Sequence, residues 1–324
     1  MKAWVIHRAG GPEQFQLEEQ PMPSPQNGWA LIRVRAFGLN RSECFTRRGD
    51  SPTVQFPRIL GIECVGEIVH AGGLKLPIGT RVAAIMGGMG RQFDGAYAEY
   101  CLVPHASLLR LNTQLPWATL AALPELLQTT HGSLHTGLEI DNAESLLIRG
   151  GTSSIGLAAL VLAKQAGLRV GTTTRNDAQE TNLIHAGADE VWIDNGQLAE
   201  QIAASIFKPY DRVLELVGTS TVLDSLRCVS RGGIVCMAGM LGGQWSLDRF
   251  HPMEDIPTGV KLTSYSGEAA DLTDKQLQTY LDQVAAGSLT LPTGPVFDFT
   301  DLVAAHRLMD QNRAGGKIVV LGLP

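Results

Sequence analysis

A glycine-rich run with the sequence RGGTSSIG, residues 149–156, has the spacing of a loop that could hold the phosphates of a dinucleotide. Gly151 and Gly156 occupy the first and third glycine positions of the pattern G-x-G-x-x-G, and Ser153 stands at the second. The run follows an apolar stretch of strand character and precedes an apolar helix that we expect to start near Ile155. Helix N-terminal amides meet a pyrophosphate at such a place. The sequence therefore predicts a cofactor loop; a glycine-rich turn that binds nothing is the alternative.

Each residue type in this run has a physical role. Gly151 allows the tight turn after the strand, and Gly156 lets the following helix pack close to that strand. Ser153 is the smallest polar substitute for glycine, and its hydroxyl can itself bond a phosphate oxygen. We expect a cofactor to contact Gly151, Ser153, Ser154, Ile155 and Gly156.

The sequence TTTRN, residues 172–176, lies where the second strand of such a unit ends and where the cofactor is chosen. NAD sites carry an acidic residue about 20 positions after the loop, which bonds the ribose 2′-hydroxyl. Here Thr174 and Arg175 stand in that place, and the first carboxylate is Asp177. A guanidinium binds phosphate in a bidentate fork, so the sequence favours NADPH over NADH. A solvated arginine after a strand is the alternative.

Strands and helices alternate from about residue 123 onward, which indicates βαβ units and a parallel sheet. The expected strands include SLLIRGG, LRVGTTT, YDRVLELVG and GGIVCMAGM, and the expected helices include GLAALVLAKQAG and a segment around Thr221–Val229. Gly167 follows the first of these helices and is expected to end it. Residues before about 115 instead form short β-branched or aromatic runs separated by turn residues. The tail adds a helix, a strand, a short helix and the final strand GGKIVVLG.

Composition limits the function further. A chain of 324 residues is long for one core and suggests about two domains. Its net charge of −6 gives no support to nucleic-acid or membrane binding, and no apolar run approaches the length of a membrane span. The five cysteines form no C-x-x-C pair, so we interpret them as buried thiols in a cytoplasmic protein.

The chain resembles the medium-chain dehydrogenase/reductase superfamily, in particular its zinc-independent NADPH:quinone oxidoreductase-like branch. The resemblance runs over nearly the full length, on the motifs GLNRSECFTRRG, LGIECVGEIVHAGG, GTRVAAI, DGAYAEY, IRGGTSSIGLAALVLAKQAG, GADEVWID and DRVLELVG. It implies an α/β fold: a GroES-like β-rich catalytic domain over 1–122, to which the tail 266–324 returns, and a Rossmann doubly wound parallel sheet domain over 123–265 that binds NADPH. It also implies a nicotinamide site between the domains and a homodimer.

The zinc ligands of the superfamily's alcohol dehydrogenases are replaced in this sequence. Asn40 stands at a cysteine position, and the Gly-His-Glu triplet reads Gly61-Ile62-Glu63. A tetrahedral zinc site cannot be completed from these residue types, so we expect no metal. His131 and His135 are spaced as a local alternative, but they have no third ligand in sequence.

The resemblance assigns further site residues. Asn40 is expected to bond the substrate carbonyl or to orient the nicotinamide; an asparagine that only holds its own turn is the alternative. Lys317 is expected to reach the cofactor from the tail, with a solvated lysine as the alternative. The remaining cofactor-binding positions are Thr129, Val217, Gly218, Ala238 and Gly239, and Met240 is expected to line the substrate pocket.

Two departures leave the substrate open. Several quinone oxidoreductases carry tyrosines where this chain has Phe45 and Ser51, so this side of the pocket has no phenol to donate a hydrogen bond. The predicted reaction is hydride transfer from NADPH to a small electrophilic molecule, a quinone or an α,β-unsaturated carbonyl. An enoyl-thioester reductase and an NADPH-binding protein with little turnover are the alternatives. Cys44 is a possible reactive thiol beside Phe45, although no neighbour in sequence lowers its pKa.

Overall fold

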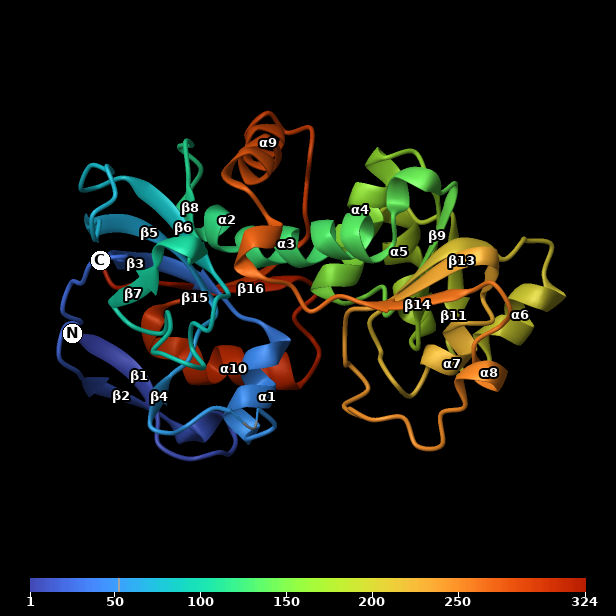
Figure 1. The fold of residues 1–324 in the computed structure, drawn as a ribbon, viewed down its shortest axis with the longest axis horizontal. Coiled ribbons are helices and arrows are strands. Elements are labelled where there is room, and N and C mark those ends of the chain that lie inside the picture. Colours follow the sequence, from blue (N-terminus) through green and yellow to red (C-terminus); the bar gives the residue numbers. More distant parts are fainter. Residues whose placement is uncertain (52) are drawn as a thin grey trace. The chain divides into compact units, whose positions relative to one another are not determined.

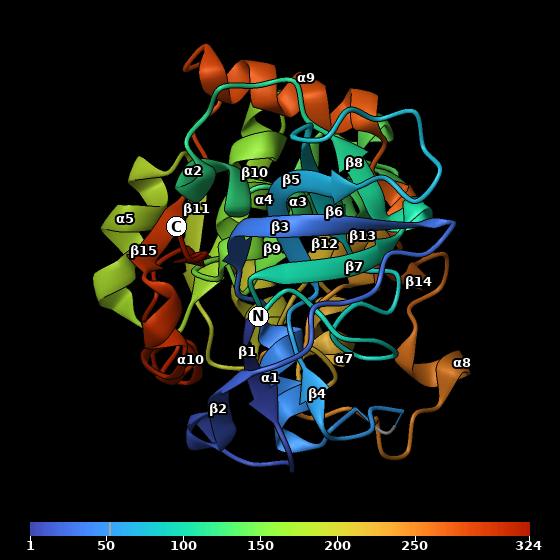
Figure 2. The ribbon, with the colours of Figure 1, turned by 90° about the vertical axis from the view of Figure 1, so that its left-hand side faces the viewer.

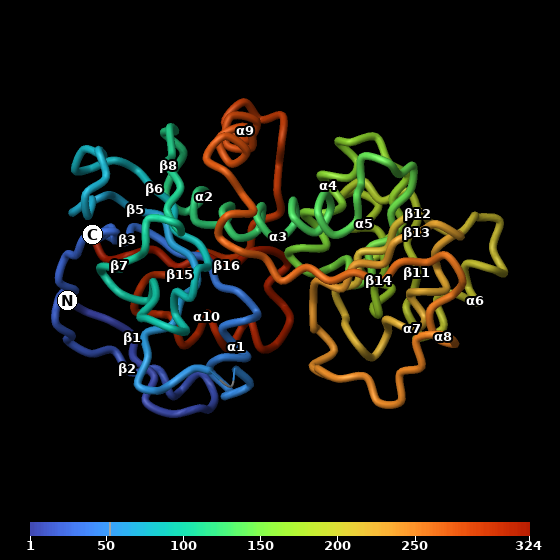
Figure 3. Tube along the Cα trace, in the orientation of Figure 1, coloured from blue at the N-terminus to red at the C-terminus, as the bar shows by residue number. Residues whose placement is uncertain are grey.

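The computed structural model describes residues 1–51 and 53–324, and these residues form two units. The β-rich unit contains Met1–Leu127 and Glu268–Pro324, and the central unit contains Gln128–Gly267. The sequence analysis expected boundaries after residues 122 and 265. Figure 3 traces how the tail, in red, returns to the unit that begins the chain, in blue.

The central unit contains a parallel sheet with strand order β11-β10-β9-β12-β13-β14. This is the order of a doubly wound dinucleotide-binding sheet, in which β9 and β12 meet where the order reverses. The predicted fold class is therefore confirmed for this unit. Its strands are β9 (Ser145–Arg149), β10 (Arg169–Thr174), β11 (Glu190–Ile193), β12 (Tyr210–Glu215), β13 (Val229–Met237) and β14 (Lys261–Ser264).

Helices connect these strands, as the alternating pattern predicts. Strand β9 is buried along its whole length, which explains its uninterrupted apolar sequence before Arg149. The first helix ends as expected, because Gly167 adopts the left-handed conformation with φ 84°. The helices are α4 (Ser154–Gln165), α5 (Glu180–His185), α6 (Leu198–Ala204), α7 (Val222–Ser225) and α8 (Pro252–Asp255).

The helix expected around Thr221–Val229 is wrong in length. Helix α7 covers only Val222–Ser225, and β13 already begins at Val229. Val229 pairs with Tyr210 of β12, so sheet pairing takes the residue that the sequence pattern assigned to the helix. A β-branched residue packs well in a strand, which favours this outcome.

The β-rich unit contains two sheets within the described residues. One has the order β2-β1-β4, and the other has the order β15-β16-β3-β5-β6-β8, with β7 also paired to β3. Figure 2 shows β7 and β5 on either side of β3. The strands are β1 (Lys2–Ile6), β2 (Phe15–Glu19), β3 (Trp29–Gly38), β4 (Arg58–Ile59), β5 (Glu63–His70), β6 (Arg81–Ile85), β7 (Tyr100–Pro104), β8 (Leu108–Arg110), β15 (Thr293–Phe297) and β16 (Lys317–Leu321).

The tail is an integral part of the β-rich unit. Strand β16 pairs with β3, where the red and blue ribbons run together in Figure 1. The indole Nε1 of Trp4 donates to the carbonyl of Phe299 over 2.8 Å, and both side chains belong to one apolar core. Beside these strands lie α1 (Arg41–Arg48), α2 (Trp117–Ala121), α9 (Asp274–Ala285) and α10 (Leu302–Asp310), while α3 (Pro124–Gly132) runs across the unit boundary.

No helix built from the described residues has both the length and the apolar character that a bilayer crossing requires.

Candidate functional site

The loop between β9 and α4 has the close backbone packing that its glycines predict. A Cβ on Gly156 would lie 2.5 Å from the carbonyl oxygen of Gly150 and 2.9 Å from the Cα of Gly151. A Cβ on Gly151 would collide with the hydroxyl of Thr172 on the neighbouring strand. The tight turn itself is made by Gly150, with φ 95°, a residue that the sequence analysis did not select.

Ser153 has a different role from the phosphate contact that its hydroxyl suggested. It is the N-cap of α4: its Oγ accepts from the amide of Gly156 over 3.1 Å and donates to the carbonyl of Gly150 over 2.8 Å. The hydroxyl proton is therefore used inside the loop. The serine stabilises the start of α4, as an N-cap does. Ser154 and Ile155 follow as the first two residues of the helix, so helix α4 begins one residue earlier than expected.

The end of β10 carries the residues predicted to choose the cofactor. The Oγ of Thr174 is buried in a local turn, where it accepts from the amide of Asn176 over 3.1 Å. Arg175 is exposed. Its guanidinium has no hydrogen bond or ion pair with any residue that the structure describes.

The turns after β12 and β13 bring five predicted residues together. A Cβ on Gly218, which has φ 108°, would lie 2.7 Å from the sulfur of Met240. A Cβ on Gly239 would lie 2.5 Å from the carbonyl oxygen of Leu216. The group consists of Val217, Gly218, Ala238, Gly239 and Met240.

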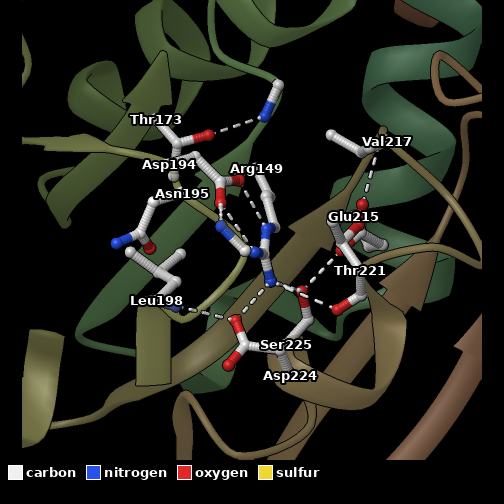
Figure 4. A network of polar contacts seen from close by, with 12 residues as sticks. Arg149, Thr173, Asp194, Asn195, Leu198, Glu215, Val217, Thr221, Asp224 and Ser225 are labelled. Atoms are coloured by element: carbon white, nitrogen blue, oxygen red, sulfur yellow. Dashed lines mark hydrogen bonds and ion pairs between the residues drawn. The ribbon is translucent and has the colours of Figure 1, made fainter. Parts of the chain in front are cut away.

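A buried polar network lies at the ends of β9, β11 and β12, and sequence reasoning missed it (Figure 4). Its centre is Arg149, whose side chain is 0% exposed. The guanidinium binds Asp194, which follows β11, and Asp224 of α7. It also donates to the hydroxyl of Ser225, which in turn donates to Glu215 at the end of β12. The sequence signal that was available is an arginine directly after the apolar run at residues 146–148.

The carboxylates of this network hold backbone turns. Glu215 accepts from the amides of Val217 and Gly218 over 2.7 and 3.0 Å. Burial alone raises the pKa of Glu215, and its hydrogen bonds and Arg149 oppose that shift without cancelling it. Burial would lower the pKa of Arg149, but Asp194 and the other carboxylates outweigh it, so the pKa of Arg149 is raised.

A second polar cluster surrounds Asn40 in the β-rich unit. Asn40 is the N-cap of α1 in a capping box with Glu43, and its amide Nδ2 donates to Glu63 over 3.1 Å. Its Oδ1 accepts from the ammonium of Lys317. Lys317 also lies 2.7 Å from Glu63 and 2.6 Å from Glu125. The structure therefore brings two predicted residues, Asn40 and Lys317, into direct contact.

Lys317 is 2% exposed, so the alternative of a solvated lysine is wrong. Burial would lower the pKa of Lys317, but Glu125 and Glu63 outweigh it and raise the pKa. The ammonium is thus held charged between two carboxylates.

Glu43 extends the cluster into the core of the β-rich unit. Its carboxylate accepts from the hydroxyl of Tyr97 over 2.7 Å and from the amide of Ile62 over 2.8 Å. Tyr97 contacts His306 over 3.1 Å, and His306 contacts Arg47 over 3.3 Å. Burial raises the pKa of Glu43 to about 7, against the opposing effect of Tyr97 and the other donors.

Cys44 lies next to this group with its thiol buried. Burial raises the pKa of Cys44 to about 12, so the thiolate that a nucleophile needs is not formed near neutral pH.

Three other predicted residues lie in ordinary local contacts, and their roles stay predictions. Phe45 is half-buried with the guanidinium of Arg48 5.5 Å from its ring centre. Ser51 shares a hydrogen bond of 3.0 Å with Thr46. Thr129, half-buried on α3, donates to the side chain of Gln128 over 3.3 Å.

The residues around Asn40 do not fit a zinc ion. Ile62 offers a buried apolar side chain, and Glu63 is already neutralised by Lys317, whose charge would repel a cation beside it. His131 and His135 stack with ring centres 4.3 Å apart. Throughout residues 1–51 and 53–324 there is no group of three or more metal-ligating side chains suited to an ion.

Two family models match the chain. The model described as an alcohol dehydrogenase GroES-like domain matches residues 26–113, and the model described as a zinc-binding dehydrogenase matches residues 186–320. The first match lies within the β-rich unit, so the GroES-like part of the predicted fold class is confirmed.

Relatives match over the full length. The chain is 27% identical to a quinone oxidoreductase of Sus scrofa, over 99% of this chain and 98% of the relative. It is 26% identical to a 2-haloacrylate reductase of a Burkholderia species, over 98% of each. The crystal structure of Escherichia coli quinone oxidoreductase complexed with NADPH has the same fold, with a TM-score of 0.86, 21% identity, and coverage of 99% of this chain and 100% of that one.

These matches agree with the strand order of the central sheet and with the return of the tail to the β-rich unit. Over its full length the chain is similar to proteins of the medium-chain dehydrogenase/reductase superfamily.

Proposed function

We propose that this protein is an NADPH-dependent oxidoreductase that transfers hydride to a quinone or an α,β-unsaturated carbonyl compound. The observation that carries the proposal is the loop between β9 and α4, in which Gly151 and Gly156 leave no room for a side chain. The amides of Gly150, Gly151 and Ser153 are already bonded, so the amides left for an anion are those that begin α4. The loop lies at the carboxyl end of β9, where parallel sheets of this order bind dinucleotides.

The residues present fit the pyrophosphate of a dinucleotide. Ser154 and Ile155 begin a twelve-residue helix, and the first amides of a helix have no acceptor within it. Together with the helix dipole, these amides favour an anion. Ser153 contributes by fixing the helix start, because its hydroxyl holds both Gly150 and Gly156.

Arg175 supports NADPH as the cofactor. Its guanidinium is exposed at the end of β10, the strand whose end lies at the adenosine ribose in this class of sheet. It makes no hydrogen bond or ion pair with the described residues, so its donors are available for the two oxygens of a 2′-phosphate. The E. coli quinone oxidoreductase of the same fold was crystallised with NADPH.

The substrate class follows from what the chain can and cannot supply. When bound, NADPH supplies a hydride from C4 of its nicotinamide. The residues around Asn40 do not fit a Lewis-acid metal that would polarise a simple ketone, so the substrate must carry its own activation. Quinones and haloacrylates, named for two relatives, share a carbon–carbon double bond conjugated to a carbonyl group.

Asn40 fits better as a residue that orients the nicotinamide than as a residue that donates a hydrogen bond to the substrate carbonyl. Its Nδ2 is directed at the carboxylates of Glu63, at 3.1 Å, and Glu43, at 3.5 Å, so it has no free proton for a substrate carbonyl. Its Oδ1 accepts from Lys317 and keeps a second lone pair. We assign this oxygen to the carboxamide nitrogen of the nicotinamide.

The remaining chemistry needs few groups. Met240, beside Gly218, offers an apolar wall that excludes water from the reacting carbon. The hydride bonds to the β-carbon, the electron pair of the double bond moves toward the carbonyl oxygen, and a proton from water completes the product.

Turnover assays test the proposal. Oxidation of NADPH, followed by nicotinamide absorbance, is measured with a naphthoquinone, an alkenal, a crotonyl thioester and a saturated ketone as control. We expect turnover with at least one of the first two and none with the ketone. Turnover with the thioester alone would instead favour the enoyl-thioester reductase, and tight NADPH binding with no turnover would favour a binding protein.

A further inference from the structure

The exposed guanidinium of Arg175 has a carboxylate as its neighbour along the sheet edge. Strands β10 and β11 pair in parallel, with Thr174 opposite Ile193. The next residue after Ile193 is Asp194, whose amide donates to the carbonyl of Thr174 over 2.8 Å. Asp194 therefore lies beside the peptide that carries Arg175, and an ion pair between the two side chains would be the ordinary expectation.

Arg149 already holds both oxygens of Asp194. Its Nε donates to Oδ2 over 2.7 Å, and its Nη2 donates to Oδ1 over 2.8 Å. The amide of Gly196 also donates to Oδ1, over 2.9 Å. Figure 4 shows the guanidinium and the carboxylate facing each other in this fork. The side chain of Asp194 is 8% exposed, so its charge is directed into the sheet edge.

Other contacts fix the orientation of the Arg149 guanidinium. Its Nη1 donates to Asp224 over 2.7 Å, to the hydroxyl of Ser225 over 3.1 Å and to the carbonyl of Thr221 over 3.2 Å. Asp224 in turn accepts from the first amides of α6, those of Leu198 and Ala199. The fork on Asp194 is thus anchored to two helices and cannot rotate away without breaking several buried hydrogen bonds.

We propose that Arg149 is a positioning residue for cofactor specificity: by occupying Asp194, it leaves Arg175 available for the 2′-phosphate of NADPH. The inference rests on the proposed function, because it takes the end of β10 as the ribose site. Arg149 does not touch the cofactor in this account and acts through Asp194 alone.

The charges of Asp194 and Arg175 explain why Arg149 affects the preference for NADPH over NADH and not the binding of both cofactors. A released Asp194 would pair with Arg175 and add a negative charge where the 2′-phosphate enters, which opposes NADPH. The same carboxylate can accept a hydrogen bond from a ribose 2′-hydroxyl, which favours NADH. Burial raises the pKa of Asp194, but Arg149, the amide of Gly196 and the charge of Arg175 together outweigh it and lower the pKa, so Asp194 is a full charge at neutral pH.

The test compares dissociation constants for NADPH and NADH, measured by fluorescence titration of the nicotinamide in the full-length protein. Arg149→Met should reduce the preference for NADPH by about tenfold, the effect of one charged contact. Arg149→Met combined with Asp194→Asn should restore most of the preference, because no carboxylate then competes for Arg175. A merely structural role would weaken both cofactors equally in both variants.

Two further variants keep the result interpretable. Arg212 is also buried in the central unit but donates only to backbone carbonyls, including that of Leu138, so Arg212→Met should leave the NADPH-to-NADH ratio unchanged. Should Arg149→Met fail to fold, Arg149→Lys keeps the buried charge without the fork, and it should lose part of the preference.

Arg175→Ala separates failure of this inference from failure of the proposed function. If Arg175→Ala weakens NADPH and NADH equally, the 2′-phosphate site itself is wrong. If Arg175→Ala selectively weakens NADPH while Arg149→Met, or Arg149→Lys in its place, leaves the ratio unchanged, the role of Arg149 alone is overturned.

Discussion

At the scale of single residues, the side chains that matter are those whose polar atoms are already engaged. Ser153 looked like a phosphate ligand, but its hydroxyl caps α4. Asn40 and Lys317 were each predicted to approach the cofactor, and the structure joins them to each other and to Glu63. The roles of Asn40 and Lys317 at the cofactor stay predictions, and the sequence could not predict their partners, because these lie on segments far apart in the chain. Arg149 was missed for the same reason: its three carboxylate neighbours are 45 to 75 residues away along the sequence.

Removing the ammonium of Lys317 should destabilise the β-rich unit. In Lys317→Met the carboxylates of Glu63 and Glu125 stay close together without a counter-charge. We expect the free energy of unfolding to fall by about 3–5 kcal/mol in chemical denaturation, the cost of breaking a buried ion pair.

An exposed lysine provides the matched control. Lys261 lies 3.7 Å from Glu139, and both side chains are more than half exposed. Lys261→Met should change the free energy of unfolding by less than about 1 kcal/mol. Equal losses in the two variants would contradict the role given to the buried cluster.

At the scale of elements, the sequence predicted what local periodicity controls. The alternation of strands and helices in the central unit and the position of α4 follow from patterns within a few residues, and the structure agrees with them. Helix α7 is shorter than predicted because Val229 pairs with β12, a contact that no local pattern contains. The glycine that makes the turn, Gly150, was overlooked because the motif has two adjacent glycines of identical type.

The packing of α4 on the loop gives a prediction for Gly156. In Gly156→Ala the new methyl group would meet backbone atoms of Gly150 and Gly151, which cannot move as a side chain can. We expect the loop to shift, the free energy of unfolding to fall by about 1–3 kcal/mol, and NADPH to bind more weakly. Gln165→Ala, on the exposed end of the same helix, should change neither; an unaltered NADPH affinity in Gly156→Ala would argue against the loop as the cofactor site.

Glu43 on helix α1 gives a prediction of how the free energy of unfolding depends on pH. Burial raises the pKa of Glu43 from 4.5 to about 7, so between these values the folded protein binds the proton more tightly than the unfolded chain. The contribution of Glu43 to the free energy of unfolding should therefore fall by about 3 kcal/mol as pH rises from about 4.5 to about 7. Chemical denaturation at pH 5 and pH 7 measures it.

Comparing the wild type with Glu43→Gln separates the contribution of Glu43 to this pH dependence from the contributions of other carboxylates. The stability of the variant should depend less on pH over this range than that of the wild type. Glu144→Gln, at an exposed position of the central unit, should follow the wild type. A Glu43→Gln curve parallel to the wild type would show that Glu43 does not titrate in this window.

At the scale of the whole molecule, we propose that the protein binds NADPH at the loop between β9 and α4 and transfers hydride to a substrate. The parallel sheet follows from the alternation of strands and helices in the sequence, because buried strands leave strong local signals, whereas the doubly wound arrangement and the return of the tail were implied by the resemblance. The substrate leaves no such signal: Phe45 and Ser51 are predicted to line the substrate pocket, but their residue types do not specify which substrate the pocket accepts.

Transfer of an isotopic label tests the central claim most directly. NADPH deuterated at C4, on the face from which hydride leaves, is incubated with the protein and an alkenal, and the saturated product is analysed by mass spectrometry. Direct hydride transfer predicts one deuterium on the β-carbon of the product. In a second incubation, with unlabelled NADPH in deuterated water, the β-carbon should acquire no deuterium. A β-carbon that takes its hydrogen from the solvent would contradict the proposed reaction.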